Sequence, residues 1–239
     1  MNGGVAHATP PFYLIFWRFA LKNYKYLFFD LDGTVTDSCE GIYKSFVYAL
    51  EYYGVKVDDV NSLRPILGPP LKDSFMNMFG FDEKKAEAAV AKYRERFSVK
   101  GLFENRVYDG VRELLSSLKG KGYITCLATS KPEEFAGRCL EYFKLDGLFD
   151  FITGATFDGT RNTKEDVIGH IINTLGITDV GQILMIGDRK YDLLGAAEFG
   201  IDGLGVLYGY GSKEELELCP HIALADTPKD IEAFLIQGR

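Results

Sequence analysis

The sequence predicts an α/β fold: a doubly wound parallel sheet with an inserted all-helical cap. From residue 106 onward, short apolar runs alternate with amphipathic segments, which is typical of repeated β-α-β units with helices on both faces of a sheet. Between residues 39 and 105, apolar residues recur only at helical spacing and no convincing strand appears. We therefore expect an α/β core formed by residues 23–38 and 106–239, and a helical cap formed by residues 39–105.

The individual elements follow from local patterns, taken in chain order. Six short apolar runs are predicted to be strands: residues 24–29, 123–128, 149–153, 182–186, 203–207 and 221–224. Helices are predicted at residues 40–53, 73–79 and 83–99 in the cap, and at residues 111–119, 132–143, 164–175, 193–199 and 230–236 in the core. Residues 63–71 contain three prolines and a glycine, so we expect an irregular loop there.

Composition narrows the class of protein. The 239 residues can bury a substantial core, and a net charge of −7 argues against a general nucleic-acid-binding protein, which would present a basic face. The four cysteines are widely spaced and form no C-x-x-C pair, which favours reduced thiols in a cytoplasmic protein over a zinc site or a disulfide framework. We expect a cytoplasmic monomer or homodimer that binds no nucleic acid.

Residues 1–22 are expected to be an appendage to the core. The apolar run at residues 12–21 is too short to span a bilayer, and it lacks the basic start and the cleavage site of a signal peptide. A short helix packed on the core, or a segment that precedes the domain, fits it better than a membrane anchor. We therefore expect no membrane partner.

Two carboxylates follow the first predicted strand. Asp30 ends that strand, Asp32 comes two residues later, and Gly33 lets the backbone turn sharply. Carboxylates this close repel each other unless a cation lies between them or one of them keeps a proton. Mg²⁺ suits such a site, because it takes oxygen ligands and retains water and substrate phosphate. A plain acidic turn at the end of a strand is the simpler alternative.

Other polar residues also follow predicted strands, and ligands of α/β proteins bind at the carboxyl ends of strands. Thr129 and Ser130 end the second strand, where they either hold a phosphate or cap the next helix. Lys164 begins a helix, as a phosphate ligand or as a surface charge. Asp188 ends a strand and Asp192 follows about one helical turn later, which again indicates a metal site.

Together, these residues resemble the four motifs of the haloacid dehalogenase superfamily in order and in spacing. The first motif spans residues 30–34, the second contains Thr129 or Ser130, the third is Lys164, and the fourth spans residues 187–192. The subgroup that the chain resembles most is the phosphoglycolate phosphatase-like hydrolases, which carry a helical cap after the first motif. The resemblance covers the chain from about residue 24 to its end.

The resemblance implies a mechanism. Asp30 would be the nucleophile that forms an aspartyl-phosphate, and Asp32 the general acid and then the general base. Mg²⁺ would be held by Asp30, the backbone carbonyl of Asp32, and Asp188, with Asp192 as a further ligand or a neighbour of one. The phosphoryl group would be held by Lys164, by Gly33 and by Thr129 or Ser130, with Thr129 favoured. Candidate leaving-group contacts in the cap are Arg64 and Lys72, together with Gly68, Pro69, Tyr93 and Arg96.

The resemblance further implies a Mg²⁺-dependent phosphatase that acts on small phosphomonoesters, of the phosphoglycolate or the nucleoside monophosphate (5′-nucleotidase) type. The presence of Asp32 argues against the dehalogenase branch of the superfamily, which lacks this residue. A β-phosphoglucomutase-like phosphoryl transferase shares the same motifs and stays open. So does a catalytically idle binding protein, although every expected catalytic group is present.

Overall fold

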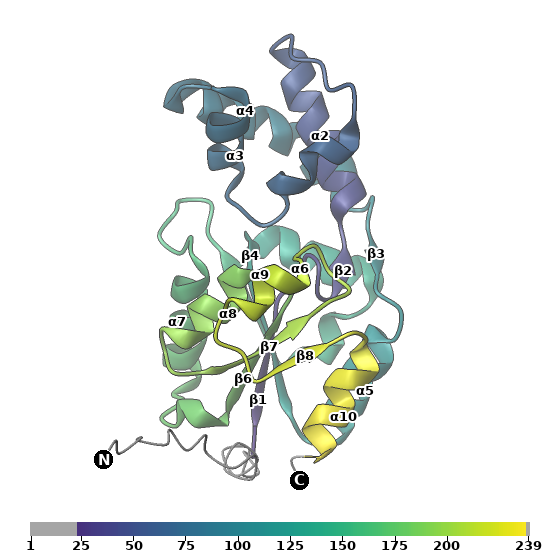
Figure 1. The fold of residues 1–239 in the computed structure, drawn as a ribbon, viewed down its shortest axis with the longest axis vertical. Coiled ribbons are helices and arrows are strands. Elements are labelled where there is room, and N and C mark those ends of the chain that lie inside the picture. The colour runs from purple at the N-terminus through teal and green to yellow at the C-terminus, as the bar shows by residue number, and fades with distance from the viewer. Residues whose placement is uncertain (1–22, 238–239) are drawn as a thin grey trace, which may run out of the picture.

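The computed structural model describes residues 23–237, and it confirms the predicted fold class. Six parallel strands form one sheet in the order β5-β4-β1-β6-β7-β8 (Figure 1). The strands are β1 Tyr26–Phe29, β4 Ile124–Pro132, β5 Phe151–Ala155, β6 Ile183–Gly187, β7 Asp202–Val206 and β8 Ala223–Ala225. The chain proceeds outward from β1 in one direction through β4 and β5, and in the other through β6, β7 and β8. The switch point of the sheet therefore lies between β1 and β6.

Helices cover both faces of this sheet because successive strand residues point to opposite sides. Leu27 and Phe29 of β1 pack in the same buried cluster as side chains of α5 Val111–Gly120, α6 Glu133–Phe143 and α10 Pro228–Gln237. Phe28, between them, packs with side chains of α7 Lys164–Leu175 and α8 Lys190–Ala197. A further short helix, α9 Lys213–Glu217, was not predicted from the sequence.

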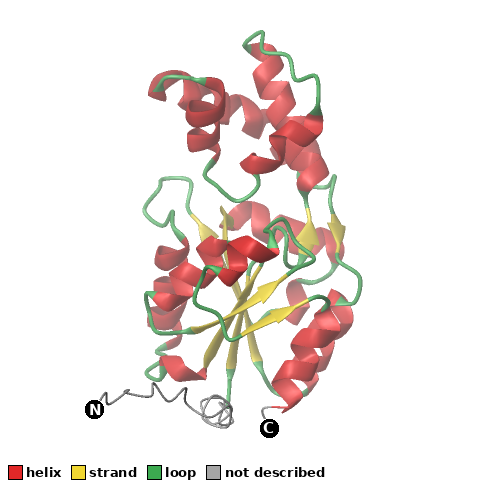
Figure 2. Ribbon diagram, viewed as in Figure 1, coloured by secondary structure: helices red, strands yellow, loops and turns green. Residues whose placement is uncertain are grey.

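The segment between residues 39 and 105 consists of helices joined by loops, and it lies beyond the carboxyl ends of the strands (Figure 2). It consists of α2 Cys39–Tyr52, a 3₁₀ helix Val60–Ile66, α3 Leu71–Phe79, and α4 Glu83–Arg96, which continues as a π-helix Phe97–Gly101. Its interior contains Phe46 stacked on Phe75, with ring centroids 4.1 Å apart. Two short antiparallel strands, β2 Thr36–Asp37 and β3 Arg106–Val107, form the two crossings to the core. Neither of them was predicted.

The prediction of an irregular loop at residues 63–71 was wrong for its first part. The 3₁₀ helix Val60–Ile66 forms despite Pro65, and the carboxylate of Asp59 caps it by accepting a hydrogen bond from the Asn61 N–H. Residues three apart lie above one another in a 3₁₀ helix, so that Leu63 and Ile66 are buried together in the cap.

The prediction that residues 1–22 are an appendage, and that the apolar run 12–21 is not a membrane span, lies outside the described residues. Within residues 23–237, no helix is both long enough and apolar enough to cross a bilayer.

Close glycine packing between α2 and the π-helix gives a test of the cap. A Cβ at Gly41 would overlap the backbone carbonyl of Gly101. We expect Gly41→Ala to lower the free energy of unfolding by about 1–3 kcal/mol through overpacking. The matched control is Gly137→Ala in α6, where a Cβ would meet nothing and helix propensity should add up to about 1 kcal/mol. Urea unfolding measures both, and equal effects of the two substitutions would contradict the packing argument.

Candidate active site

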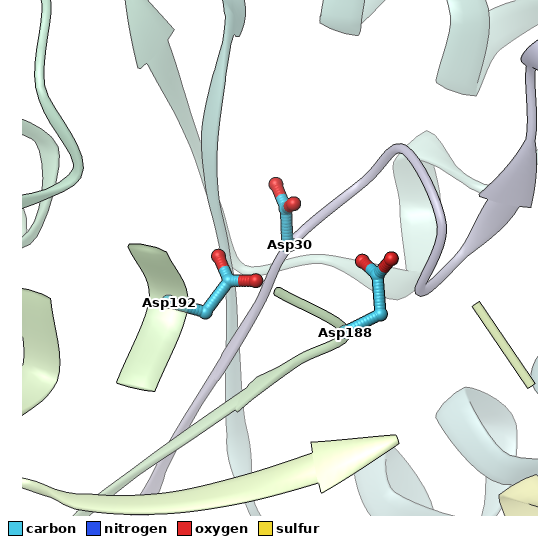
Figure 3. A group of neighbouring side chains, drawn as sticks. All are labelled: Asp30, Asp188 and Asp192. Carbon is cyan, nitrogen blue, oxygen red and sulfur yellow. The ribbon is translucent and has the colours of Figure 1, made fainter. Parts of the chain in front are cut away.

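The switch point of the sheet brings three carboxylates together. Asp30 follows β1 and Asp188 follows the neighbouring strand β6, so parallel pairing places both at the same edge. Asp192 projects from the first turn of α8, which begins two residues after Asp188. One oxygen from each of Asp30, Asp188 and Asp192 lies within 4.8 Å of the other two (Figure 3). The structure thus brings the predicted metal-binding side chains into one group.

Two glycines leave room for these carboxylates. A Cβ at Gly33 would overlap the Oδ2 atom of Asp188, and a Cβ at Gly187 would overlap the carboxylate of Asp192. Gly33 also has a φ of +91°, a conformation that side-chain-bearing residues rarely adopt. In this structure Gly33 therefore contacts Asp188, and its predicted contact with substrate stays a prediction.

Among residues 23–237, Lys164 is the one ammonium group that contacts this cluster. Its Nζ lies 3.0 Å from Oδ1 of Asp30 and 2.6 Å from Oδ1 of Asp192, and it donates a hydrogen bond to the carbonyl of Ala128 at 2.8 Å. The side chain is almost completely buried. Burial alone would lower the pKa of Lys164, but the two aspartates outweigh that effect and raise its pKa. Lys164 is therefore a fixed positive charge.

One lysine does not compensate three carboxylates. Burial, reinforced by Asp192 and Asp32, raises the pKa of Asp30 to about 6 although Lys164 opposes the shift. Burial, followed by repulsion from Asp192 and Asp30, raises the pKa of Asp188 well above its ordinary range. Without a further cation, the folded protein thus favours protonation of this cluster.

The donor set fits a divalent, oxygen-preferring ion. Oδ1 of Asp30 and Oδ1 of Asp192 are buried and accept no well-aligned hydrogen bond, although Lys164 lies within ion-pair distance of both. Buried polar oxygens without donors are rare in folded proteins, and their presence here indicates a missing electropositive partner. Because all three side chains offer carboxylate oxygens as ligands, Mg²⁺ is a suitable ion for this site.

Asp32 lies in a different environment. Its two carboxylate oxygens are each 2.8 Å from Nζ of Lys131, and Ser38 donates a hydrogen bond to Oδ1 at 2.6 Å. The aromatic ring of Phe97, from the cap, covers the same ammonium group at 4.9 Å from its centroid. The carboxylate of Asp32 thus has its own cation and is not a member of the three-aspartate group. The predicted role of its backbone carbonyl as a metal ligand stays a prediction.

Lys131 was not identified from the sequence. The register of β4 against β5 shifts between Ala128 and Pro132, and Gly154 lets the bulged backbone approach closely. Thr129 and Lys131 are both buried, and Ser130 between them is exposed. Strand alternation from Thr129 would have placed the lysine on the same side as the hydroxyl.

The alternative that Thr129 or Ser130 caps a helix was wrong. α6 begins after Pro132 and has no side-chain cap. Instead, Oγ1 of Thr129 accepts a hydrogen bond from the backbone N–H of Lys131 at 3.2 Å, within the bulge. This contact leaves the hydroxyl proton of Thr129 available to a phosphate oxygen.

A second set of contacts that the sequence did not reveal fixes Asp188. The hydroxyl of Thr34 donates to Oδ1 at 3.1 Å, and the backbone N–H of Tyr210 donates to Oδ2 at 2.7 Å. The Tyr210 hydroxyl in turn accepts a hydrogen bond from the backbone N–H of Ser38 at 2.7 Å. Tyr210 therefore contacts both the three-aspartate group and the serine that holds Asp32.

The cap residues proposed as leaving-group contacts have different surroundings. Arg64 reaches the core and donates to the carbonyl of Tyr210 at 3.3 Å. Gly68 leaves room for the guanidinium of Arg189, so it too touches the core. In contrast, Lys72 is paired with Glu83 and Glu87 of α4, and no contact described here joins it to the aspartates.

The remaining candidates lie within the cap. Tyr93 is buried there and stacks on Phe97, and Arg96 pairs with Glu104. Pro69 is half-buried. Of Arg64 and Lys72, the two cap residues that the sequence analysis names first, only Arg64 lies at the boundary between cap and core.

This fold and this arrangement of strand-end residues agree with a family model described as haloacid dehalogenase-like hydrolase, which matches residues 27–206. The chain belongs to that family of hydrolases.

Individual relatives are closely similar. A protein of Pseudomonas aeruginosa named 5′-nucleotidase is 47% identical over 83% of this chain and 90% of its own length. The tyrosine-protein kinase PtkA of Mycobacterium tuberculosis is 40% identical over 79% of this chain and 64% of its own. The crystal structure of a predicted phosphatase from Clostridium acetobutylicum superposes with a TM-score of 0.86 at 45% identity, over 90% of this chain and 99% of that one.

The electrostatic frustration of the cluster can be measured without turnover. Because the folded-state pKa of Asp188 is raised, its carboxylate opposes folding at pH 7.5, and this penalty fades as the pH falls through the folded-state pKa towards the unfolded value. In EDTA, we expect Asp188→Asn to stabilise the protein at pH 7.5 by about 1–2 kcal/mol, and by less at pH 5. Denaturant unfolding at the two pH values gives the comparison.

The control for this experiment is Asp58→Asn, which neutralises an exposed aspartate. It should change stability by less than about 0.5 kcal/mol at either pH. A loss of stability in Asp188→Asn at pH 7.5, or a gain independent of pH, would contradict the proposed repulsion.

Proposed function

We propose that the protein is a Mg²⁺-dependent phosphatase that hydrolyses small phosphomonoesters through an aspartyl-phosphate on Asp30. The observation that carries this proposal is the contrast between two neighbouring carboxylates. Asp30 shares one lysine with Asp192 in a group of three carboxylates, whereas Asp32, two residues on, has Lys131 to itself. A nucleophile and an acid/base need such different surroundings.

The phosphoryl transfer begins at Asp30. An oxygen of its carboxylate attacks phosphorus in line, the new O–P bond forms, and the bond to the leaving alkoxide breaks. Lys164 is positioned to neutralise both Asp30 and the equatorial phosphate oxygens, and Thr129 offers a hydroxyl donor beside it. A bound Mg²⁺ would keep Asp30 ionised and offset the charge that develops on the phosphoryl oxygens.

Asp32 acts first as the general acid and then as the general base. In its protonated form it gives the proton to the leaving alkoxide. The resulting carboxylate then takes a proton from the water that attacks phosphorus, and the bond between phosphorus and Asp30 breaks to release phosphate and the free Asp30 carboxylate. The described contacts correspond to the second half of this cycle, because both oxygens of Asp32 accept hydrogen bonds from Lys131. Ser38 orients the carboxylate throughout.

For the substrate, we propose a nucleoside monophosphate or a small acid phosphate such as phosphoglycolate. The strong similarity to a relative named 5′-nucleotidase supports the first. We also propose that the protein works in the cytoplasm, where its four unpaired cysteines, three of them buried, would stay reduced.

Phosphoryl transfer to an acceptor other than water is the second candidate. It is supported by the similarity to PtkA, whose name describes a kinase. An aspartyl-phosphate on Asp30 serves both outcomes, since only the group that accepts the phosphoryl differs. The amount of inorganic phosphate released per substrate consumed separates the two: one per substrate for a phosphatase, and less than one when an added alcohol or sugar phosphate is the acceptor.

The first test is phosphate release from phosphoglycolate, nucleoside monophosphates, sugar phosphates and 4-nitrophenyl phosphate. We expect release with Mg²⁺, none with EDTA, and a loss of at least about a hundredfold in Asp30→Asn, because the amide is no nucleophile. Asp58→Asn should retain the full rate. Metal-independent release, or full activity in Asp30→Asn, would contradict the proposed mechanism.

The role of Asp32 predicts a dependence on the leaving group. In Asp32→Asn, alkyl phosphate esters should react about 10²–10⁴-fold more slowly, since no acid protonates the alkoxide. The leaving group 4-nitrophenolate needs no proton, so this variant should release it in a burst equal to the enzyme concentration, followed by slow hydrolysis of the intermediate. Rapid-mixing absorbance measures the burst. An equal slowing of both substrate types, without a burst, would argue against the acid/base role.

A further inference from the structure

A cavity of about 240 Å³ lies where the cap, the core and the two crossing strands β2 and β3, here called the hinge strands, meet. We call it the hinge pocket and define it by six of its residues: Tyr43, Arg64, Arg106, Tyr108, Tyr208 and Tyr210. A larger cavity, of about 570 Å³, lies before the amino ends of β1, β4 and β6, at the other end of the sheet from Asp30. Of the two, only the hinge pocket adjoins the catalytic groups.

Tyr210 connects the pocket to those groups. Its side chain lines the pocket, its backbone N–H binds Asp188, and its hydroxyl binds Ser38, which holds Asp32. A general acid must contact the oxygen of the leaving group, so the leaving group departs on the side of Asp32. Tyr210 and Ser38 thus link the wall of the hinge pocket to Asp32.

The walls of the pocket combine aromatic rings with unused hydrogen-bond donors. Four tyrosines line it, and the rings of Tyr108 and Tyr208 pack edge to face with centroids 5.0 Å apart. Among the described residues, the hydroxyls of Tyr43 and Tyr108 have no hydrogen-bond partner. Arg64 donates only to the carbonyl of Tyr210, and no carboxylate of the described chain pairs with it.

The carboxylate in the lining of the pocket is already paired. The carboxylate of Asp37 accepts two hydrogen bonds from the guanidinium of Arg106, at 3.1 and 2.9 Å. The pocket thus offers planar apolar surface together with donors, which complements a planar ring that carries carbonyl and ring-nitrogen acceptors. Nucleobases have this character, and they stack on tyrosine rings and on guanidinium groups.

We propose that the hinge pocket is the subsite for the base of a nucleoside monophosphate whose phosphate lies at Asp30. This inference rests on the proposed phosphatase function, and it narrows the substrate to the nucleotide class. A glycolate leaving group has no ring for the tyrosine walls to cover. Arg64, the cap residue that reaches the core, becomes the residue that distinguishes nucleotides from simpler phosphate esters.

The test compares two substrates that differ only by the base. Uridine 5′-monophosphate carries a uracil with two carbonyl acceptors, and ribose 5-phosphate has the same sugar and phosphate without it. For the wild type, we expect kcat/KM for the nucleotide to be at least about fivefold higher, the lower bound for stacking one base. In Arg64→Gln, kcat/KM should fall several-fold for the nucleotide and stay within twofold for ribose 5-phosphate and 4-nitrophenyl phosphate.

Arg112→Gln is the matched control, because Arg112 also donates to main-chain carbonyls, those of Phe143 and Lys144, but lies outside the pocket. It should leave the ratio of the two substrates unchanged, and thermal unfolding checks that both variants fold. Equal kcat/KM values for the two substrates in the wild type would overturn the proposal. So would an Arg64→Gln variant that slows both by the same factor.

Failure of the phosphatase function is distinguishable from failure of this subsite. If the phosphatase function fails, no substrate, 4-nitrophenyl phosphate included, would release phosphate. Uridine binding, measured by calorimetry, then tests the pocket on its own: weaker binding to Arg64→Gln than to the wild type and to Arg112→Gln supports the subsite. Absence of uridine binding to the wild type, or equal binding to all three proteins, overturns it.

Discussion

The repulsion among Asp30, Asp188 and Asp192 is the constraint on which the rest of the site depends. Pairing of β1 with β6 at the centre of the sheet forces the first two together, and the first turn of α8 adds the third. Lys164 lies between two of them, although it begins α7, and the positive end of a helix dipole disfavours a cation there. The fold tolerates this unfavourable placement because the sheet fixes the positions of these residues. Unfavourable placements of this kind are typical of functional sites rather than of structural ones.

The site has two halves with different supports. The half that would bind metal and phosphate is built from strand ends and helix starts of the core, and buried contacts fix each of its carboxylates. The half that holds Asp32 is built at the boundary with the cap: Ser38 follows hinge strand β2, and Phe97 of the cap covers Lys131. The half around the three aspartates thus belongs to the core, and the half around Asp32 is shared with the cap.

The sequence predicted what depends on local pattern. Each strand was a short apolar run, and Asp30 and Asp188 were found because a carboxylate directly after such a run lies at a strand end in any parallel sheet. Lys131 was missed because its contact with Asp32 depends on a bulge in β4 and on pairing between distant parts of the chain. The hinge strands β2 and β3, of two residues each, and the short helix α9 are too brief to leave a periodic pattern. Arg64 and Lys72 looked alike in the sequence, and only tertiary contacts separate them.

The carboxylates of the site differ in the number of cations that they contact. Asp30 and Asp192 share Lys164, so each has at most part of a positive charge, and burial then raises the pKa of Asp30 to about 6. A divalent ion at this cluster would restore the ionised form of Asp30, which is the nucleophilic form. Asp32 has Lys131 as a full partner in addition to Ser38. Two aspartates separated by Leu31 therefore have different surroundings: Asp30 lies among carboxylates, and Asp32 is paired with a lysine.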